Sequence, residues 1–317
     1  MSSLPYLEVV GDVAKVGLTL TLILNSLLIY LTIAHIKGIK GTYKFLILLI
    51  AVLGIVFSSI EKLLHPFMHS YNVSFVYFTL APVFGLSKFM RTLLILLYSV
   101  LFLMIICVNT IQFVYRYLVI HNSPRVEYFH GRRAVFWIGY LLFFAGAWSY
   151  FPLQCLPDEY VIGYLKEELY SEYNADSADV AGFFSVAYEF TGTTRTWRMN
   201  AVLGAAGLCS ILGLQCSVIV FCAIKIHIRI RETMALSSKK NYQVQSQLFK
   251  TLLFQITAPS VFYHVPAFLM FLIPYLDMKI SVPSGVMICF FSIYPALDSL
   301  ILMWIVTEYH RVIGSES

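Results

Sequence analysis

Seven long apolar runs constrain this chain more than any other feature of its sequence. One helix needs about 20 mostly apolar residues to cross the hydrocarbon core of a bilayer, and each run is about that long. Strands of a membrane barrel would instead alternate apolar and polar residues over about 10 positions. The sequence therefore predicts an all-α membrane protein, a single domain of seven transmembrane helices over residues 1–317. The runs cover residues 13–33, 45–64, 92–115, 134–153, 201–224, 251–275 and 282–306.

Composition agrees with a lipid environment. Hydrophobic residues make up 59% of the chain and charged residues 12%, whereas a soluble domain carries about 45–50% and about 25%. The stretch "MSSLPYLEVVGDVAK" before the first run lacks the basic region of a signal peptide. We therefore expect the first helix to stay in the mature protein.

The charges predict the orientation in the membrane. Most of the 22 lysine and arginine residues lie in the loops after the first, third and fifth runs and in the C-terminal tail. The long loop 157–200, on the other side, is acidic. Because cytoplasmic loops are enriched in lysine and arginine, the N-terminus is expected outside and the C-terminus inside. The basic inner loop 225–250 should be helical at both ends, since "CAIKIHIRIRETM" continues the fifth helix.

The other local signals are few. Asn72 begins the triplet Asn72-Val73-Ser74 on the expected outer side and is a candidate glycosylation site. Most of the six cysteines lie inside apolar runs, which is typical of packing residues. Their spacing predicts neither a disulfide framework nor a metal site.

No enzyme motif is present: there is no nucleophile elbow, no His-Glu-x-x-His and no phosphate loop. We expect no catalysis, no cofactor and no nucleic-acid partner. A transporter or channel should line its path with several polar or charged residues, but only Asp298 is clearly an acid at mid-membrane depth. A seven-helix ligand-gated channel subunit and a small-molecule transporter are the alternative hypotheses to a receptor.

Four stretches carry a resemblance to a known family. "IKGTYKFLILLIAVL" leads into the second run, "LLHPFMHSY" closes it, "FVYRYLVI" ends the third, and "FFSIYPALDSLILMWIVTEYHR" forms the seventh run and its exit. Together they resemble nematode Str-type seven-helix chemoreceptors, and the resemblance covers nearly the whole chain. It implies a rhodopsin-like receptor architecture, a small-molecule ligand such as a volatile odorant, and a heterotrimeric G protein as partner. It also implies the plasma membrane of a sensory-neuron cilium.

The resemblance implies a role for the end of the third helix. Tyr115, Arg116 and Tyr117 match the Asp-Arg-Tyr triplet of rhodopsin-like receptors, whose arginine caps the cavity that a G-protein helix enters. Tyr115 stands where that family has an acid, so another partner for Arg116 is needed, and Glu232 and Glu308 are candidates. The alternative is an arginine that simply extends to the cytoplasmic interface. The G-protein cleft would be flanked by Lys225, Arg229, Lys250 and Arg311.

Asp298 lies deep in the seventh run, where a bare carboxylate costs at least about 2.5 kcal/mol. It needs a polar neighbour, and the candidates are Asn25, Ser58, Ser59 and Asn109. Pro295 removes one backbone hydrogen bond and lets the helix bend. Asn25, Pro295 and Asp298 are therefore expected to form either a switch or a static polar clamp. The middle of the second run has no acid, so we expect no sodium site there.

The ligand is expected in the outer half of the bundle, in an apolar pocket with a few polar groups. The candidate contacts are Glu61, Lys62, His65, Arg91, Tyr263 and His264. The alternative is that Glu61, Lys62 and Arg91 form pairs near the interface and that His264 is a packing residue.

Overall fold

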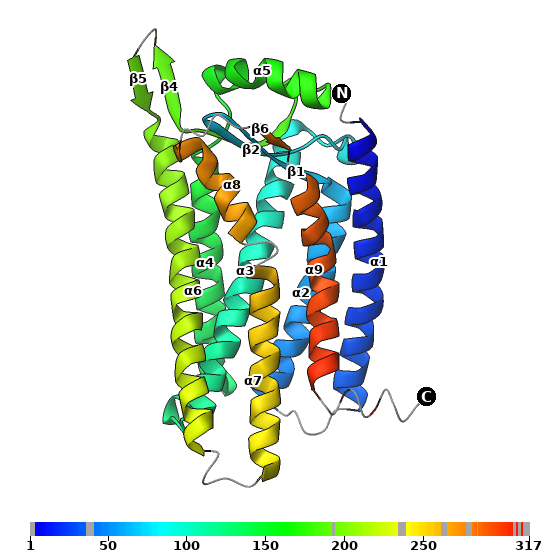
Figure 1. Ribbon diagram of the computed structural model, residues 1–317, viewed down its shortest axis with the longest axis vertical. Coiled ribbons are helices and arrows are strands. Elements are labelled where there is room, and N and C mark those ends of the chain that lie inside the picture. The colour runs from blue at the N-terminus through cyan, green and yellow to red at the C-terminus, as the bar shows by residue number, and fades with distance from the viewer. Residues whose placement is uncertain are drawn as a thin grey trace.

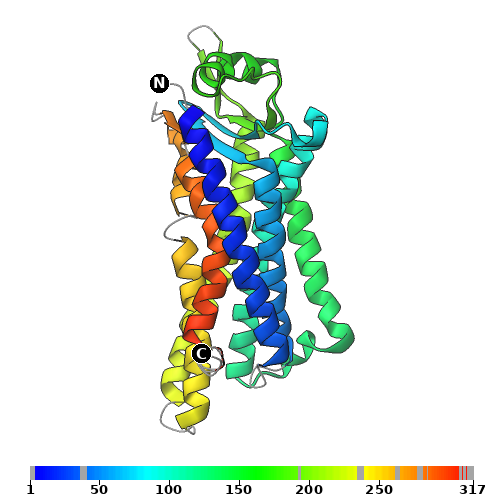
Figure 2. The ribbon, with the colours of Figure 1, turned by 90° about the vertical axis from the view of Figure 1, so that its right-hand side faces the viewer.

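The computed structural model describes residues 4–35, 41–191, 194–233, 239–260, 265–276, 281–283, 285–306, 309 and 312. Long helices run side by side, and a small β-sheet with a short helix covers one end of the bundle (Figures 1 and 2). We call this the sheet end. The opposite end holds Arg116, Arg125, Arg133 and Arg229, and we call it the basic end.

Within the described residues, six helices are long and apolar enough to cross a membrane. They coincide with six of the seven expected runs, and α3 and α6 extend well beyond them. The helices are α1 (Leu4–Ala34), α2 (Thr42–Leu64), α3 (Lys88–Ile120), α4 (Val135–Leu153), α6 (Met199–Thr233) and α9 (Gly285–Ile305). Short 3-10 segments η2 (Pro124–Phe129) and η3 (Gly131–Ala134) join α3 to α4, and η1 (Val83–Gly85) precedes α3.

The expected run 251–275 differs from the other six. The structure describes it as two helices, α7 (Lys239–Pro259) and α8 (Val265–Leu276), and residues 261–264 lie outside the described part. Pro259 ends α7 and Pro266 lies in the first turn of α8. Proline lacks a backbone N–H, so it is well tolerated in a first turn and weakens a helix in its interior.

The expectation of an all-α chain is corrected at the sheet end. Four antiparallel strands form a sheet in the order β3-β2-β1-β6, and β4 and β5 form a separate hairpin. The expected loop 157–200 therefore holds a helix and three strands, and Val282 belongs to a strand rather than to the last helix. The elements are β1 (Pro66–Tyr71), β2 (Ser74–Thr79), α5 (Glu159–Tyr173), β3 (Ala181–Val186), β4 (Tyr188–Thr191), β5 (Thr194–Trp197) and β6 (Ser281–Pro283).

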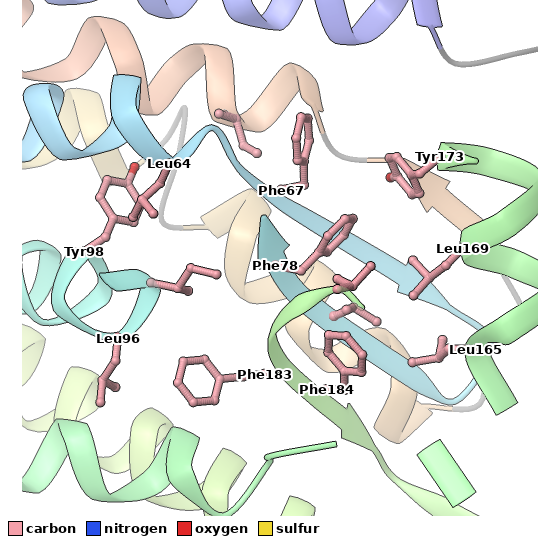
Figure 3. Close-up of a cluster of buried hydrophobic side chains, with 14 of the residues drawn as sticks. Leu64, Phe67, Phe78, Leu96, Tyr98, Leu165, Leu169, Tyr173, Phe183 and Phe184 are labelled. Atoms are coloured by element: carbon pink, nitrogen blue, oxygen red, sulfur yellow. The ribbon is translucent and has the colours of Figure 1, made fainter. Parts of the chain in front are cut away.

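Helix α5 is amphipathic and covers the sheet. Asp158 caps its first turn by accepting from the Val161 backbone N–H at 3.0 Å, and Asn174 ends it in a left-handed conformation. Its buried residues recur every four positions, which places them along one face: Val161, Leu165, Leu169 and Tyr173. In Figure 3 the last three lie against Phe67, Phe78 and Phe184 of the sheet.

The transmembrane helices approach most closely around α9. A Cβ on Gly17 of α1 would lie 2.5 Å from the Ser292 carbonyl oxygen of α9. A Cβ on Gly54 of α2 would lie 2.9 Å from Asn25 Nδ2 and 3.1 Å from Pro295 Cβ. Because lipid gives helices no hydrophobic reason to associate, close packing at small residues holds such bundles together.

Replacing Gly17 with alanine should therefore destabilise the bundle. The added methyl group meets backbone rather than a flexible side chain, so we expect a loss of about 1–3 kcal/mol in the free energy of unfolding. Gly11→Ala on the same helix is the control, because nothing lies within 4 Å of its Cβ position. Thermal unfolding of the purified protein measures both, and equal melting temperatures would contradict the packing.

A buried histidine joins α5 to the sheet. His69 of β1 is fully buried, its Nε2 lies 2.9 Å from Glu168 Oε1, and its Nδ1 lies 3.1 Å from the Tyr173 hydroxyl. In this arrangement a neutral ring donates to Glu168 and accepts from Tyr173. Burial lowers the pKa of His69 below its ordinary value, although the Glu168 and Glu172 carboxylates act in the opposite direction.

The sheet end should therefore lose stability in acid. The unfolded histidine gains its proton at about pH 6.5, above the lowered pKa of the folded state, so stability is present above that pH and falls below it. We expect His69→Gln to reduce the drop in melting temperature between pH 7.5 and 5.5. His130→Gln at the exposed basic end is the control and should keep the wild-type drop.

Candidate functional site

A cavity of about 190 Å³ lies between the helices and the sheet. Helices α3, α4, α6, α8 and α9 form its sides, and strands β1, β2 and β3 contribute the residues that close it at the sheet end. The described residues that line it are Met68, Phe75, Tyr77, Tyr98, Ser99, Phe102, Trp148, Pro152, Cys155, Phe183, Ser185, Gly204, Ala205, Leu208, Cys209, Leu212, Phe268, Phe271 and Phe291.

The two-residue period of the strands divides their side chains between two faces. Phe75 and Tyr77 of β2 line the cavity, as does Phe183 of β3. The alternate residues Phe78 and Phe184 pack toward α5 (Figure 3). One sheet thus closes the cavity with one face and holds α5 with the other.

The cavity is strongly apolar. No aspartate, glutamate, lysine, arginine or histidine occurs among the described residues that line it, and nine of them are aromatic. The Ser99 hydroxyl donates to the Leu96 carbonyl at 2.8 Å and faces the Trp148 Nε1–H at 3.4 Å. The polar groups on the walls are therefore partly occupied by bonds within the protein.

Tyr275 connects the cavity walls to one another. Its hydroxyl donates to the Ala201 carbonyl of α6 at 3.0 Å and lies 3.0 Å from the Ser185 hydroxyl of β3. Its own carbonyl accepts from the Tyr188 hydroxyl at 3.3 Å. Helix α8, which carries Phe268 and Phe271, is thereby tied to both α6 and the sheet.

The ligand contacts expected from the sequence lie elsewhere. Glu61 is buried between α2 and α9 and accepts from the Ser292 hydroxyl. Lys62 Nζ lies 2.9 Å from His65 Nε2. Arg91 donates to the carbonyls of Ala81 and Asp179 at 3.4 and 3.3 Å.

Glu61, Lys62, His65 and Arg91 are not among the residues that line the cavity. Arg91 instead bonds to carbonyls of the neighbouring loops. Tyr263 and His264 lie outside the described residues. The alternation of residues in "SFVYFT" could have predicted a strand with Phe75 and Tyr77 on one face. The abundance of aromatic residues hid this signal, because it is also typical of helix packing in membranes.

A polar cluster joins four helices in the middle of the bundle. Asn25 of α1 donates to the Ala51 carbonyl of α2 at 3.2 Å and accepts from the Ser299 hydroxyl of α9. Gln255 of α7 donates to the Asp298 backbone carbonyl at 3.4 Å. Asn25, Pro295 and Asp298 line one small cavity, so the structure brings together the three residues expected to form a switch or clamp.

Of the other polar candidates for Asp298, Ser58 faces Thr21 at 3.3 Å and Ser59 donates to its own helix at the Ile55 carbonyl at 2.8 Å.

Removal of the Asn25 amide should weaken the bundle. Hydrogen bonds between membrane helices contribute about 0.6–2 kcal/mol each, and Asn25→Ala removes two of them. We expect a loss of about 1–3 kcal/mol in the free energy of unfolding. Ser59→Ala, which removes only a bond within one helix, should stay within about 0.5 kcal/mol of wild type. Chemical unfolding measures both, and an unchanged Asn25→Ala protein would show that the cluster does not hold the helices.

At the basic end, Arg116 is buried at 5% exposure rather than extended into solvent. Its guanidinium lies 4.0 Å from the centre of the Tyr43 ring of α2, and Tyr43 stacks with Tyr115 at 6.3 Å. A cation–π contact of this kind contributes about 0.5–2 kcal/mol. Tyr43 was not among the partners expected for Arg116. Glu232 accepts from Arg229 at 3.2 Å, and Glu308 lies outside the described residues.

The other residues expected to flank a G-protein cleft are distributed around α3, α6 and α7. Tyr117 contacts Phe221 of α6 at 6.0 Å between ring centres, and Lys225 lies 6.0 Å from the same ring. Lys250 of α7 is exposed. Arg311 lies outside the described residues.

Asn72 occupies the β1–β2 turn, where its φ is +50°. Val73 and Ser74 of the same triplet are buried, and the Ser74 hydroxyl donates to the Tyr71 carbonyl at 2.7 Å. Glycosylation at Asn72 stays a prediction.

Comparison with known proteins gives the relationship of the chain. A family model described as "Serpentine type 7TM GPCR chemoreceptor Str" matches residues 11–314. The chain is 40% identical over 301 residues to "G-protein coupled receptor str-33" of Caenorhabditis elegans. The aligned region covers 94% of this chain and 87% of the relative. It is 25% identical over 315 residues to "Serpentine receptor class r-10" of the same species, with 99% and 92% of the two chains covered.

A protein also named "Serpentine receptor class r-10", from Caenorhabditis briggsae, is 23% identical over 313 residues, with 97% and 90% of the two chains covered. The family match confirms the resemblance carried by "LLHPFMHSY" and "YPALDSL". The chain belongs to the Str family of serpentine seven-transmembrane G-protein-coupled chemoreceptors.

Proposed function

We propose that this chain is a chemosensory receptor that binds a small molecule in the 190 Å³ cavity and activates a heterotrimeric G protein. The observation that carries the proposal is the cavity itself, which lies among helices that continue toward the basic end. Pockets between helices that are mostly apolar with a few polar groups are the usual sites for small ligands.

The sheet end would face outward and the basic end the cytoplasm, with the N-terminus outside. The distribution of lysine and arginine supports this orientation. Helices α7 and α8 together would make the seventh crossing. In the organism the receptor would lie in the plasma membrane of a sensory-neuron cilium, as the family relationship suggests.

The signal would pass through helices that contact both regions. Helix α3 carries Tyr98, Ser99 and Phe102 at the cavity and Arg116 at the basic end, and α9 carries Phe291 at the cavity with Asp298 below it. A ligand shifts an equilibrium only by binding one state better than the other. Binding would favour the state in which α7 moves away from α3 and releases Arg116 from Tyr43. The opened cleft would then be flanked by Lys225, Arg229, Lys250 and Arg311.

A transporter or channel is less well supported, since such a protein needs a polar path through the membrane. The cavity walls are apolar among the described residues. The polar cluster around Asn25 is instead joined by bonds that connect helices.

Arg116→Ala should abolish coupling while leaving the receptor at the cell surface. The guanidinium is buried at the basic end, so its loss removes the contact proposed for the G protein. Cells would carry an N-terminal tag that is stained without permeabilisation, and cAMP, cGMP and calcium would be recorded over a panel of volatile and water-soluble compounds.

Arg125→Ala is the control, since Arg125 is exposed at the same end of the bundle. It should respond as wild type does. A tag that stains only after permeabilisation, or a ligand-gated current that persists when G proteins are blocked, would refute the proposal.

A further inference from the structure

The size of the cavity limits what it can hold. A dry, apolar protein cavity of about 150 Å³ accommodates benzene, and the cavity under the sheet measures about 190 Å³. One six-membered ring with one or two further heavy atoms fills such a space. A peptide is much larger than this space.

The chemistry of the walls limits the charge of the occupant. Burying an isolated ion in an apolar environment is far costlier than burying a neutral group. The described walls offer an ion no side chain of opposite charge, whereas aromatic rings such as Phe102, Phe183 and Phe271 offer edges and faces to another ring. The Ser99 and Ser185 hydroxyls already face protein partners, and the walls expose little polar surface, so an occupant with few hydrogen-bonding groups is favoured.

The acidic residues of the sheet end do not change this conclusion. Asp158 and Glu189 both pair with Arg198, and Glu168 pairs with His69. Glu61 is buried behind the wall, where its carboxyl accepts from Ser292, and it is not among the lining residues. No carboxylate is among the described residues that line the cavity, so none lies on its walls to pair with a cation.

We propose that the cavity takes a single neutral molecule of about one aromatic ring in size, bearing at most one hydrogen-bonding oxygen. This inference rests on the proposed function, because it names the ligand class of the same cavity. It excludes amines in their charged form and carboxylates from the site, and it favours one-ring over two-ring compounds.

The test uses two neighbouring alanines of α6 in the purified full-length receptor. Ala205 lines the cavity and is 8% exposed, whereas Ala206 is exposed on the outer side of the bundle. Ala205→Phe should fill the cavity, and Ala206→Phe adds the same ring outside it. The probes are fluorobenzene, 4-fluorobenzylamine, 4-fluorobenzoate and 4-fluorobiphenyl, followed by fluorine NMR and by the shift in melting temperature.

We expect fluorobenzene to bind wild type and Ala206→Phe with equal affinity and to bind Ala205→Phe at least tenfold more weakly. The two charged probes should show no displaceable binding, and 4-fluorobiphenyl should bind more weakly than fluorobenzene. Binding of either charged probe as tightly as fluorobenzene, or unchanged binding to a folded Ala205→Phe protein, would overturn the proposal. If Ala205→Phe does not fold, Cys209→Leu in the cavity wall and Cys216→Leu on the exposed face form a second matched pair.

Nucleotide exchange on a G protein separates this inference from the proposed function. Specific fluorobenzene binding with no exchange across neutral one-ring compounds would refute the receptor mechanism and leave the ligand class standing. Exchange triggered by a charged or two-ring compound, and insensitive to Ala205→Phe, would refute the ligand class and leave the receptor function standing.

Discussion

In a bilayer every backbone amide and carbonyl has to find its partner within the protein, because lipid offers none. Helices meet this requirement locally, and the rest of this structure depends on it. The sheet, whose short edge strand β6 pairs with β1, occurs at one end of the bundle. Helices α7, which ends at Pro259, and α8, which begins at Val265, follow one another along the bundle (Figure 1).

Since lipid does not drive helices together, the bundle is held by close approach and by buried polar bonds. Both occur where α9 meets α1 and α2. Gly17 and Gly54 let the backbones come near, and Asn25 bonds to α2 and α9 at once. Among the described residues, Gln255 of α7 also reaches this cluster, where it donates to the Asp298 carbonyl.

The two ends of the bundle use aromatic residues differently. At the sheet end they surround a space, and the same strands that present Phe75 and Phe183 to the cavity present Phe78 and Phe184 to α5. At the basic end Tyr43 lies beneath Arg116, where rhodopsin-like receptors use an acid next to the arginine. A cation–π contact of this kind contributes about 0.5–2 kcal/mol to holding the guanidinium at this place.

The sequence by itself determined the six described spans, because the length of an apolar run is a local property that decides whether a helix can cross the bilayer. It also identified the family, through short stretches such as "HPFMHSY", and it predicted that Asn25, Pro295 and Asp298 act as one cluster. Only the tertiary structure decided the sheet, the cavity lining and the partner of Arg116. Each of these joins residues far apart in the chain, as β2 joins β3 and Tyr43 joins Arg116. No local pattern of hydropathy records which aromatic side chain faces a cavity and which one fills a core.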